Sequence, residues 1–229
     1  MSDDIRGVAR YFLQLVFFLG AFGLCLFAAA GRWDWAAGWV FLALSAAGQI
    51  ITALILRVKN PGLMGERAST KGKRDLDRVL AGVMALFGPA AICVVGGLDF
   101  RNGWQPEISP ALQIAGIVIA AAGSGLTIWA MAANRFFYGV MRIARDQGHA
   151  VCDSGPYRII RHPGYAGAIL FDLAAPLVLQ SAWAFIPAAI TVAAIVARTG
   201  MEDPKLQSGL DGYRGYAGRV RYRLLPGAW

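Results

Sequence analysis

Residues 155–167 concentrate polar side chains between long apolar runs. The stretch Gly-Pro-Tyr-Arg-Ile-Ile-Arg-His-Pro-Gly-Tyr-Ala-Gly holds one of only two histidines in the chain, with two arginines and two tyrosines. Pro163 disfavours helical geometry at His162 and suits the first turn of a helix, so we expect a helix to begin at Pro163. The unpaired N–H groups of such a helix start bind carboxylates and phosphates, and Arg158 and Arg161 would add positive charge. An interfacial anchor explains these residues equally well, because arginine and tyrosine also snorkel to membrane surfaces.

A second polar block begins where the last apolar run ends. Residues 198–206 have the sequence Arg-Thr-Gly-Met-Glu-Asp-Pro-Lys-Leu, in which Arg198 and Glu202 stand four positions apart and share one helical face. A surface ion pair is the simplest interpretation. The adjacent acids Glu202 and Asp203 favour a site instead, because ionisable groups beside a membrane are costly unless they have a function. A third block, residues 212–227, interleaves tyrosines with arginines and by itself fits an interfacial helix on anionic lipid.

The elements that must position these blocks are membrane spans. The chain has 57% hydrophobic and 16% charged residues with a mean hydropathy of +0.50, which is more apolar than a soluble domain. Its apolar runs reach about 20 residues, enough to cross ~30 Å of hydrocarbon. We therefore expect an all-α fold, a polytopic transmembrane helical bundle of about six spans, of which the last two form a tight hairpin. The expected segments are 11–30, 35–56, 79–98 and 111–133, with the hairpin at 166–197.

Details inside the apolar segments predict how the spans pack. Pro176, Gln180-Ser181 and Pro187 interrupt the 32 residues at 166–197, which favours two helices over one. Asp172 in this segment is interpreted either as a hydrogen-bond partner between helices or as a substrate contact. The segment at 111–133 carries small residues that would let another helix approach closely: Gly116, Gly123, Ser124 and Gly125.

The distribution of positive charge predicts the orientation of the bundle. Of the 22 Lys and Arg residues, 20 fall in four segments that alternate with the expected spans: residues 1–10, 57–78, 134–165 and 198–229. By the positive-inside rule these segments face the cytosol, so the polar blocks lie in one compartment and can form one site. The net charge of +8 is thereby explained without a nucleic-acid partner. Neither a zinc spacing nor a two-metal spacing occurs in the sequence, so we expect no metal.

Together the three blocks resemble the isoprenylcysteine carboxyl methyltransferase (ICMT) family, in a wider group that includes the membrane phospholipid methyltransferases. The resemblance covers about residues 135–229. It departs from the family pattern at Asp203, where members commonly have a second glutamate, and at Arg221, where they often have proline. The matching residues are Gly155-Pro156-Tyr157, Arg161-His162-Pro163, Tyr165, Gly167, Arg198, Glu202-Asp203, Leu206, Gly212-Tyr213, Tyr216 and Leu225-Pro226-Gly227.

The resemblance implies an enzyme that uses S-adenosylmethionine as its methyl donor. Residues 1–133 would form an N-terminal four-span region. Residues 134–229 would form a C-terminal methyltransferase region that combines the helical hairpin with cofactor motifs on the cytosolic side. Its partners would be a lipophilic small molecule or lipid and the surrounding membrane lipids, in a bacterial inner membrane with both termini cytosolic. The implied catalytic residues are Arg198 and Glu202. The implied cofactor-binding residues are Tyr157, Arg161, His162, Pro163, Gly164, Tyr165, Glu202 and Asp203.

The chemistry of the acceptor is left open by the sequence. A carboxylate acceptor, as in isoprenylcysteine-type O-methylation, is already ionised at neutral pH, so Arg198 would only have to orient it. A phospholipid amine must lose a proton, and His162 or Glu202 would be the candidate base. The richness in alanine and glycine suggests a bacterial source, where some lipophile other than a prenylated protein is expected. An NADPH-dependent membrane reductase of the sterol type and a non-enzymatic membrane protein are the alternatives from other classes.

Overall fold

The structure is a computed structural model that describes residues 3–59, 76–104, 108–139 and 141–229. Every regular element in these ranges is helical, which confirms the all-α expectation. Most of the linker expected at 57–78 lies outside the described residues. The helices of the first half are α1 (Asp3–Ala30), α2 (Ala36–Lys59), α4 (Leu76–Gly82), the π-helical turn η1 (Val83–Phe87), α5 (Gly88–Asn102) and α6 (Pro110–Ala133). The second half has the 3₁₀ turns η2 (Arg145–Gln147) and η3 (Gly155–Arg158), then α7 (Pro163–Val178), α8 (Phe185–Gly209) and α9 (Tyr213–Arg219).

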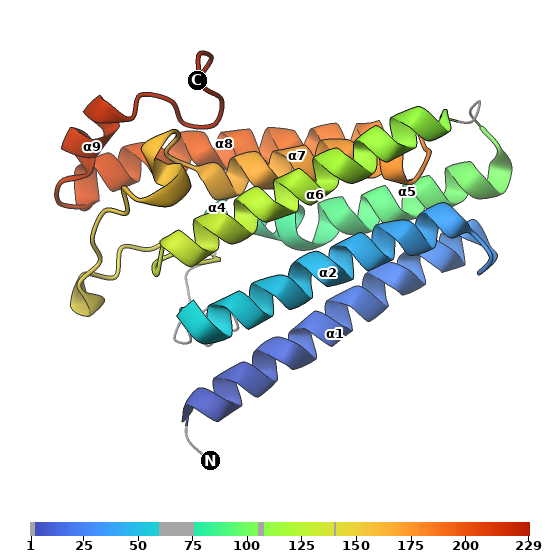
Figure 1. Cartoon of the computed structure of the whole chain (residues 1–229), viewed down its shortest axis with the longest axis horizontal. Coiled ribbons are helices and arrows are strands. Elements are labelled where there is room, and N and C mark those ends of the chain that lie inside the picture. Colours follow the sequence, from blue (N-terminus) through green and yellow to red (C-terminus); the bar gives the residue numbers. More distant parts are fainter. Residues whose placement is uncertain (1–2, 60–75, 105–107, 140) are drawn as a thin grey trace.

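The long helices run side by side and connect at opposite ends of a bundle (Figure 1). Five segments in the described ranges are long and apolar enough to cross a membrane: Phe12–Ala30, Ala36–Lys59, Leu76–Asn102, Pro110–Ala133 and Phe185–Gly209. Helix α7 is apolar but has 16 residues, about 24 Å, so the expected six spans become five long helices and one short one. The N-terminus, the end of α2, the segment 134–162 and α9 all lie at one end (Figure 1).

Helices α6 and α7 form the closest pair in the bundle because both present glycines to each other. A Cβ at Gly167 would lie 2.5 Å from the carbonyl oxygen of Gly123, and a Cβ at Gly116 would lie 2.6 Å from the Cβ of Leu177. The predicted small-residue contact is therefore confirmed at Gly116 and Gly123. It is wrong at Gly125, whose Cβ would meet nothing within 4 Å, because this position faces away from α7.

A tight turn between α7 and α8 confirms the predicted hairpin. Helix α7 ends at Val178 and α8 begins at Phe185. Gln180 adopts a positive φ of 56°, and the hydroxyl of Ser181 donates to the buried carboxylate of Asp99 on α5 at 2.6 Å. The same Ser181 oxygen accepts the N–H of Ala184, so one side chain joins the turn to both α5 and α8.

Helix α8 continues far beyond the span end expected at residue 197. It runs without a break through Arg198, Glu202 and Asp203 to Gly209, with Pro204 inside it. The second polar block therefore belongs to the last turns of this long helix, in keeping with the shared helical face expected for Arg198 and Glu202. The helix continues because the charged side chains at its inner face find partners within the protein.

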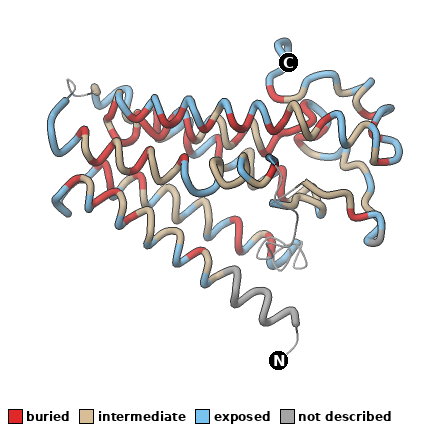
Figure 2. The backbone as a smooth tube through the Cα atoms, turned by 180° about the vertical axis from the view of Figure 1, so that it is seen from behind, coloured by how far each residue is buried: buried red, intermediate tan, exposed pale blue. Residues whose placement is uncertain are grey.

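Large apolar side chains cover the outside of the bundle. Phe17 is 69% exposed, and Ile114 and Val118 are each 62% exposed. Buried residues lie on the inner faces of the helices (Figure 2), and one buried apolar cluster joins side chains from α1, α2, α5, α6, α7 and α8. A water-soluble protein would bury these outer side chains, whereas lipid tails solvate them, so this surface fits contact with membrane lipids.

Candidate functional site

The polar blocks meet at the carboxylate of Asp203, which is fully buried on α8. Arg161 binds it with two nitrogens, Nε to Oδ1 at 2.7 Å and Nη2 to Oδ2 at 2.9 Å. Nε2 of His162 lies 3.3 Å from Oδ1 and, facing a carboxylate, carries the proton. Three further donors complete the set: the Gln207 amide, the Tyr213 hydroxyl and Nε of Arg223. Six donors therefore converge on one carboxylate.

The charges in this cluster stabilise one another. Burial disfavours the charged guanidinium of Arg161, but the hydrogen bonds and negative charge of Asp203 outweigh it and raise the pKa of Arg161. Burial raises the pKa of Tyr213, and the neighbouring carboxylate of Asp203 raises it further. Arg161 is therefore a cation, and Tyr213 a neutral donor, at any physiological pH.

The segment that follows α9, residues 220–229, packs across the residues that precede α7, and we call this segment the strap. The N–H of Arg161 donates to the carbonyl of Tyr222, and the N–H of His162 donates to the carbonyl of Arg223, each at 2.9 Å. Nη1 of Arg161 also donates to the carbonyls of Val220 and Arg221, at 2.8 and 2.7 Å. The third block thus closes over the first, in contrast to the free interfacial helix that it suggested by itself.

Tyr165, in the first turn of α7, joins the two charged residues expected to be catalytic. Its hydroxyl donates to Oε2 of Glu202 at 2.6 Å, and the guanidinium carbon of Arg198 lies 5.6 Å from the centre of its ring. Arg198 and Glu202 do not form the ion pair that their spacing allows. Nε of Arg198 binds Asp77 of α4 at 2.9 Å instead, and its Nη2 donates to the carbonyl of Gly139 at 3.0 Å.

Two cavities lie on either side of Tyr165. The larger, of about 390 Å³, is surrounded by the long helices and is mostly apolar; Arg198 lies at its polar end. The smaller, of about 90 Å³, lies at the end of the bundle that holds α9, with Glu202, His162 and Asn134 among its lining residues. Both are lined by Phe137, Tyr138, Gly164 and Tyr165. The cavities therefore share a wall, and the side chains expected to be catalytic stand on its two sides.

The shared wall depends on a glycine. A Cβ at Gly164 would lie 2.4 Å from the ring of Phe137, so only glycine lets this ring approach the start of α7 so closely. Pro163 begins α7 and His162 precedes it, as the sequence predicts. The N–H of Gly164 has no intrahelical acceptor at this position, and Gly164 lines both cavities.

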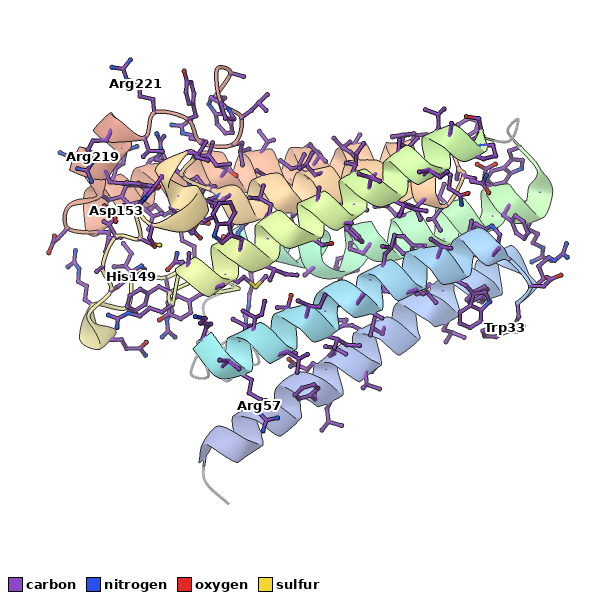
Figure 3. The ribbon with its side chains drawn as sticks, in the orientation of Figure 1. Trp33, Arg57, His149, Asp153, Arg219 and Arg221 are labelled. Atoms are coloured by element: carbon purple, nitrogen blue, oxygen red, sulfur yellow. The ribbon has the colours of Figure 1, made fainter. Side chains whose placement is uncertain are left out.

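Aromatic rings line the smaller cavity opposite α7 and α8. The rings of Phe136 and His149 stack with their centroids 4.3 Å apart, and the ring of Tyr138 meets His149 edge-on at 6.3 Å. Burial lowers the pKa of His149, and the nearby positive charges of Arg135 and Arg142 lower it further. A neutral imidazole follows, with its Nδ1 accepting the N–H of Ala144. Figure 3 shows His149 at the same end of the bundle as Arg219 and Arg221, opposite Trp33.

The structure brings most of the expected site residues together. Tyr157 is buried beneath the smaller cavity, where its hydroxyl accepts from Asn134 at 3.4 Å. Arg158, which was expected to add positive charge beside Arg161, is instead exposed at the end of the 3₁₀ turn η3 and lines neither cavity. The described ranges contain no group of three or more His, Cys, Asp or Glu side chains arranged to hold a metal ion.

The comparison with known families decides the class of the protein. Residues 114–208 match the model of the isoprenylcysteine carboxyl methyltransferase (ICMT) family, from α6 through the Asp203 cluster. This match supports membership of the chain in the ICMT family. No curated protein matches the chain with significant similarity. The family match and the five apolar helices of spanning length together indicate a multi-pass membrane methyltransferase. Helix α9 and the strap that follows it lie outside the segment matched to the ICMT family.

Several residues of the site were missed by the sequence analysis. Asp77 lies in the Lys- and Arg-rich segment 57–78 and Arg223 in the segment 198–229, and neither residue was given a role of its own. His149 and the rings of Phe136 and Phe137 received no role. The one available signal was that His149 is the second of only two histidines and lies in the segment that also holds His162.

Proposed function

We propose that the protein transfers a methyl group from S-adenosylmethionine to the carboxylate of a lipophilic acceptor. The supporting observation is that an apolar cavity among the spans and a polar, aromatic cavity at the bundle end share the wall at Tyr165 and Gly164. A methyl transfer needs its two reactants in line and shielded from water, which two adjoining cavities provide. Arg198 stands on the acceptor side of this wall and Glu202 on the cofactor side.

The chemistry of the smaller cavity fits S-adenosylmethionine, which supplies an electrophilic methyl group on a sulfonium. The free N–H of Gly164 at the positive end of α7 suits its carboxylate, and Glu202 suits its ribose hydroxyls. The stacked rings of Phe136 and His149 offer a flat apolar surface for the adenine ring of the cofactor. The cavity of about 90 Å³ is smaller than the 300 Å³ or more of typical ligand pockets. The wall that contains Phe136, Tyr138 and His149 would therefore move outward on binding.

The expected cofactor ligands divide into contacts and supports in this proposal. Glu202, Tyr165, Gly164 and His162 face the smaller cavity and would touch the cofactor. Asp203 has six donors and no exposed surface, so we assign it the role of fixing Arg161 and His162 in place. Arg161 uses four of its five N–H donors to bind Asp203 and the carbonyls of Val220 and Arg221. Tyr157 lines the smaller cavity, and Pro163 starts α7 without lining it.

Arg198 would orient the acceptor. Its Nε and Nη2 are held by Asp77 and the Gly139 carbonyl, while Nη1 has no partner among the described residues and borders the larger cavity. A guanidinium fixed at one edge and open at the other binds a carboxylate without having to reorganise. The apolar walls of the cavity of about 390 Å³ would hold the hydrocarbon part of the acceptor.

We further propose that the end of the bundle with α9 faces the cytosol of a bacterial cell, with both termini on that side. The described parts of the four segments rich in Lys and Arg lie at this end, in line with the positive-inside rule. In this arrangement residues 134–229 supply most of the cofactor side. Residues 1–133 supply most of the walls of the acceptor cavity.

The type of bond formed tests the proposal. Membranes containing the protein are incubated with methyl-labelled S-adenosylmethionine and a lipid extract, and the labelled lipid is then treated with dilute base. A methyl ester releases its label as methanol under base, whereas an N-methyl group does not. We expect base-labile label, which Arg198→Lys reduces by about tenfold or more through loss of the planar guanidinium. Label that is stable to base would contradict a carboxylate acceptor and would indicate a phospholipid amine as the acceptor instead.

A further inference from the structure

Asp172 is the one buried acid in the described ranges that the protein leaves without a partner. Four acids are buried there: Asp77, Asp99, Asp172 and Asp203. Asp77 binds Arg198, Asp99 accepts from Ser181, and Asp203 accepts from six donors. Asp172 is 8% exposed, lies midway along α7, and has neither a hydrogen bond nor an ion pair with any described residue.

The carboxyl of Asp172 is open toward the larger cavity. Asp172 lines that cavity, and no side-chain oxygen or nitrogen among the described residues is both fully enclosed and unpaired. The oxygens of Asp172 are therefore not fully enclosed, and the cavity is the space that this residue lines. The helix–helix hydrogen bond that the sequence offered as one interpretation of Asp172 is absent from the described residues. The other interpretation, a contact with substrate, agrees with this geometry.

A second polar side chain that lines this cavity also lacks a hydrogen-bond partner among the described residues. Gln49 lies in the middle of α2, lines the cavity, and makes no side-chain hydrogen bond to a described residue. The hydroxyls nearby on α2 are engaged, since Ser45 donates to the carbonyl of Phe41 and Thr52 to that of Gly48. The mostly apolar cavity thus presents the Asp172 carboxyl, an acceptor when ionised, and the Gln49 amide, which can both donate and accept, without partners among the described residues.

The position of Asp172 fixes how far this polar group lies from the reacting end. Tyr165 and Asp172 are seven residues apart on α7, which places them on nearly the same helical face and about 10 Å apart along the axis. Ala168, between them, also lines the cavity. An acceptor extended along α7, with its reacting group at Tyr165, would pass its middle over Asp172.

We propose that the acceptor carries a hydrogen-bond donor, a hydroxyl or an amine, within its apolar body, and that Asp172 binds this donor about 10 Å from the methylated end. This inference rests on the proposed function for the direction of the acceptor. A purely hydrocarbon chain would seal the carboxyl of Asp172 away from water with no partner, which penalises binding. A chain with a donor at that depth satisfies it, so Asp172 selects a functionalised lipid against a plain isoprenoid or alkyl chain.

The test measures binding of defined acceptors in the absence of methyl donor. Octadecanoate, 10-hydroxyoctadecanoate and 10-aminooctadecanoate are titrated into the protein in nanodiscs, with binding followed by intrinsic tryptophan fluorescence. We expect at least one functionalised chain to bind about tenfold more tightly than octadecanoate, the ratio for one hydrogen bond to a charged or buried group. Comparing the affinities for the hydroxyl and amine derivatives shows which of the two groups is the preferred donor.

Variants separate this inference from the proposed function. Asp172→Leu should abolish the preference and bind octadecanoate at least as well as the native protein does. Asp172→Asn, which is nearly isosteric, should keep part of a preference for the hydroxyl and lose one for the amine. Asp211→Leu, at an exposed acid outside both cavities, should leave the preference unchanged. Equal binding of all three chains, or a preference that survives in Asp172→Leu, would overturn the inference whether or not methyl transfer is observed.

Discussion

At the scale of single residues, Asp203 determines how the site is held. Its donors come from before α7 (Arg161 and His162), from α8 itself (Gln207), from α9 (Tyr213) and from the strap (Arg223). A carboxylate accepts all of these bonds because it has two equivalent oxygens and no hydrogen of its own. An aspartate also reaches less far than the glutamate that the ICMT family commonly has here, so the partners must come to it.

Replacing Asp203 with asparagine should therefore be costly. The amide keeps one acceptor oxygen and turns an N–H₂ group toward Arg161, which leaves a buried guanidinium without its counter-charge. We expect a loss of about 3–5 kcal/mol in the free energy of unfolding, the usual penalty for breaking a buried ion pair. Thermal melting in detergent, followed by circular dichroism, would measure it. Asp211→Asn, at an exposed acid near α9, is the matched control and should melt like the native protein.

The residues of the site could be predicted from the sequence only where they belong to a local pattern. His162-Pro163 marks a helix start through backbone sterics, and Glu202-Asp203 stands out as an acid pair at the edge of an apolar run. Asp77 could not be found this way because its partner Arg198 lies 121 positions away, and nothing in the spacing connects them. The same holds for Arg223, whose bond to Asp203 depends on the path of the strap.

At the scale of elements, the close packing of α6 against α7 positions the start of α7, where the two cavities share a wall. Gly123 and Gly167 let the two backbones touch, and the hydroxyl of Thr127 donates to the carbonyl of Gly164 at 3.2 Å, next to the shared wall of the cavities. This contact was predictable because small residues in a span have few other uses. The end of α8 was not predictable, because the charges after residue 197 look like a surface tail until their buried partners are known.

Substitution of Gly167 by alanine tests this pairing. The new Cβ would lie 2.5 Å from the carbonyl oxygen of Gly123 and 2.8 Å from the N–H nitrogen of Thr127, and neither backbone atom can move without separating the helices. We expect a destabilisation of about 1–3 kcal/mol, typical of overpacking, seen as a lower melting temperature. Gly125→Ala on α6 meets nothing within 4 Å and should be neutral or slightly stabilising. Equal melting temperatures for the two variants would contradict the proposed packing.

At the scale of the whole molecule, the protein separates an apolar interior from one polar end. The number and order of the spans followed from hydropathy, and the charge distribution indicated which segments share an end. The two cavities could not be predicted, because an internal volume depends on where side chains fail to fill space. The shortness of α7 was also hidden, since its apolar run continues into α8 across the turn at Gln180 and Ser181.

Direct binding of S-adenosylmethionine tests the central claim, that the smaller cavity belongs to a methyl donor. The purified protein, in detergent and in nanodiscs, is equilibrated with labelled S-adenosylmethionine and competed with S-adenosylhomocysteine and with NADPH. We predict saturable binding that S-adenosylhomocysteine displaces and NADPH does not, weakened about tenfold or more in Glu202→Ala by loss of a charged acceptor in the cavity. Absence of saturable binding in both environments, or displacement by NADPH alone, would contradict the assignment of this cavity.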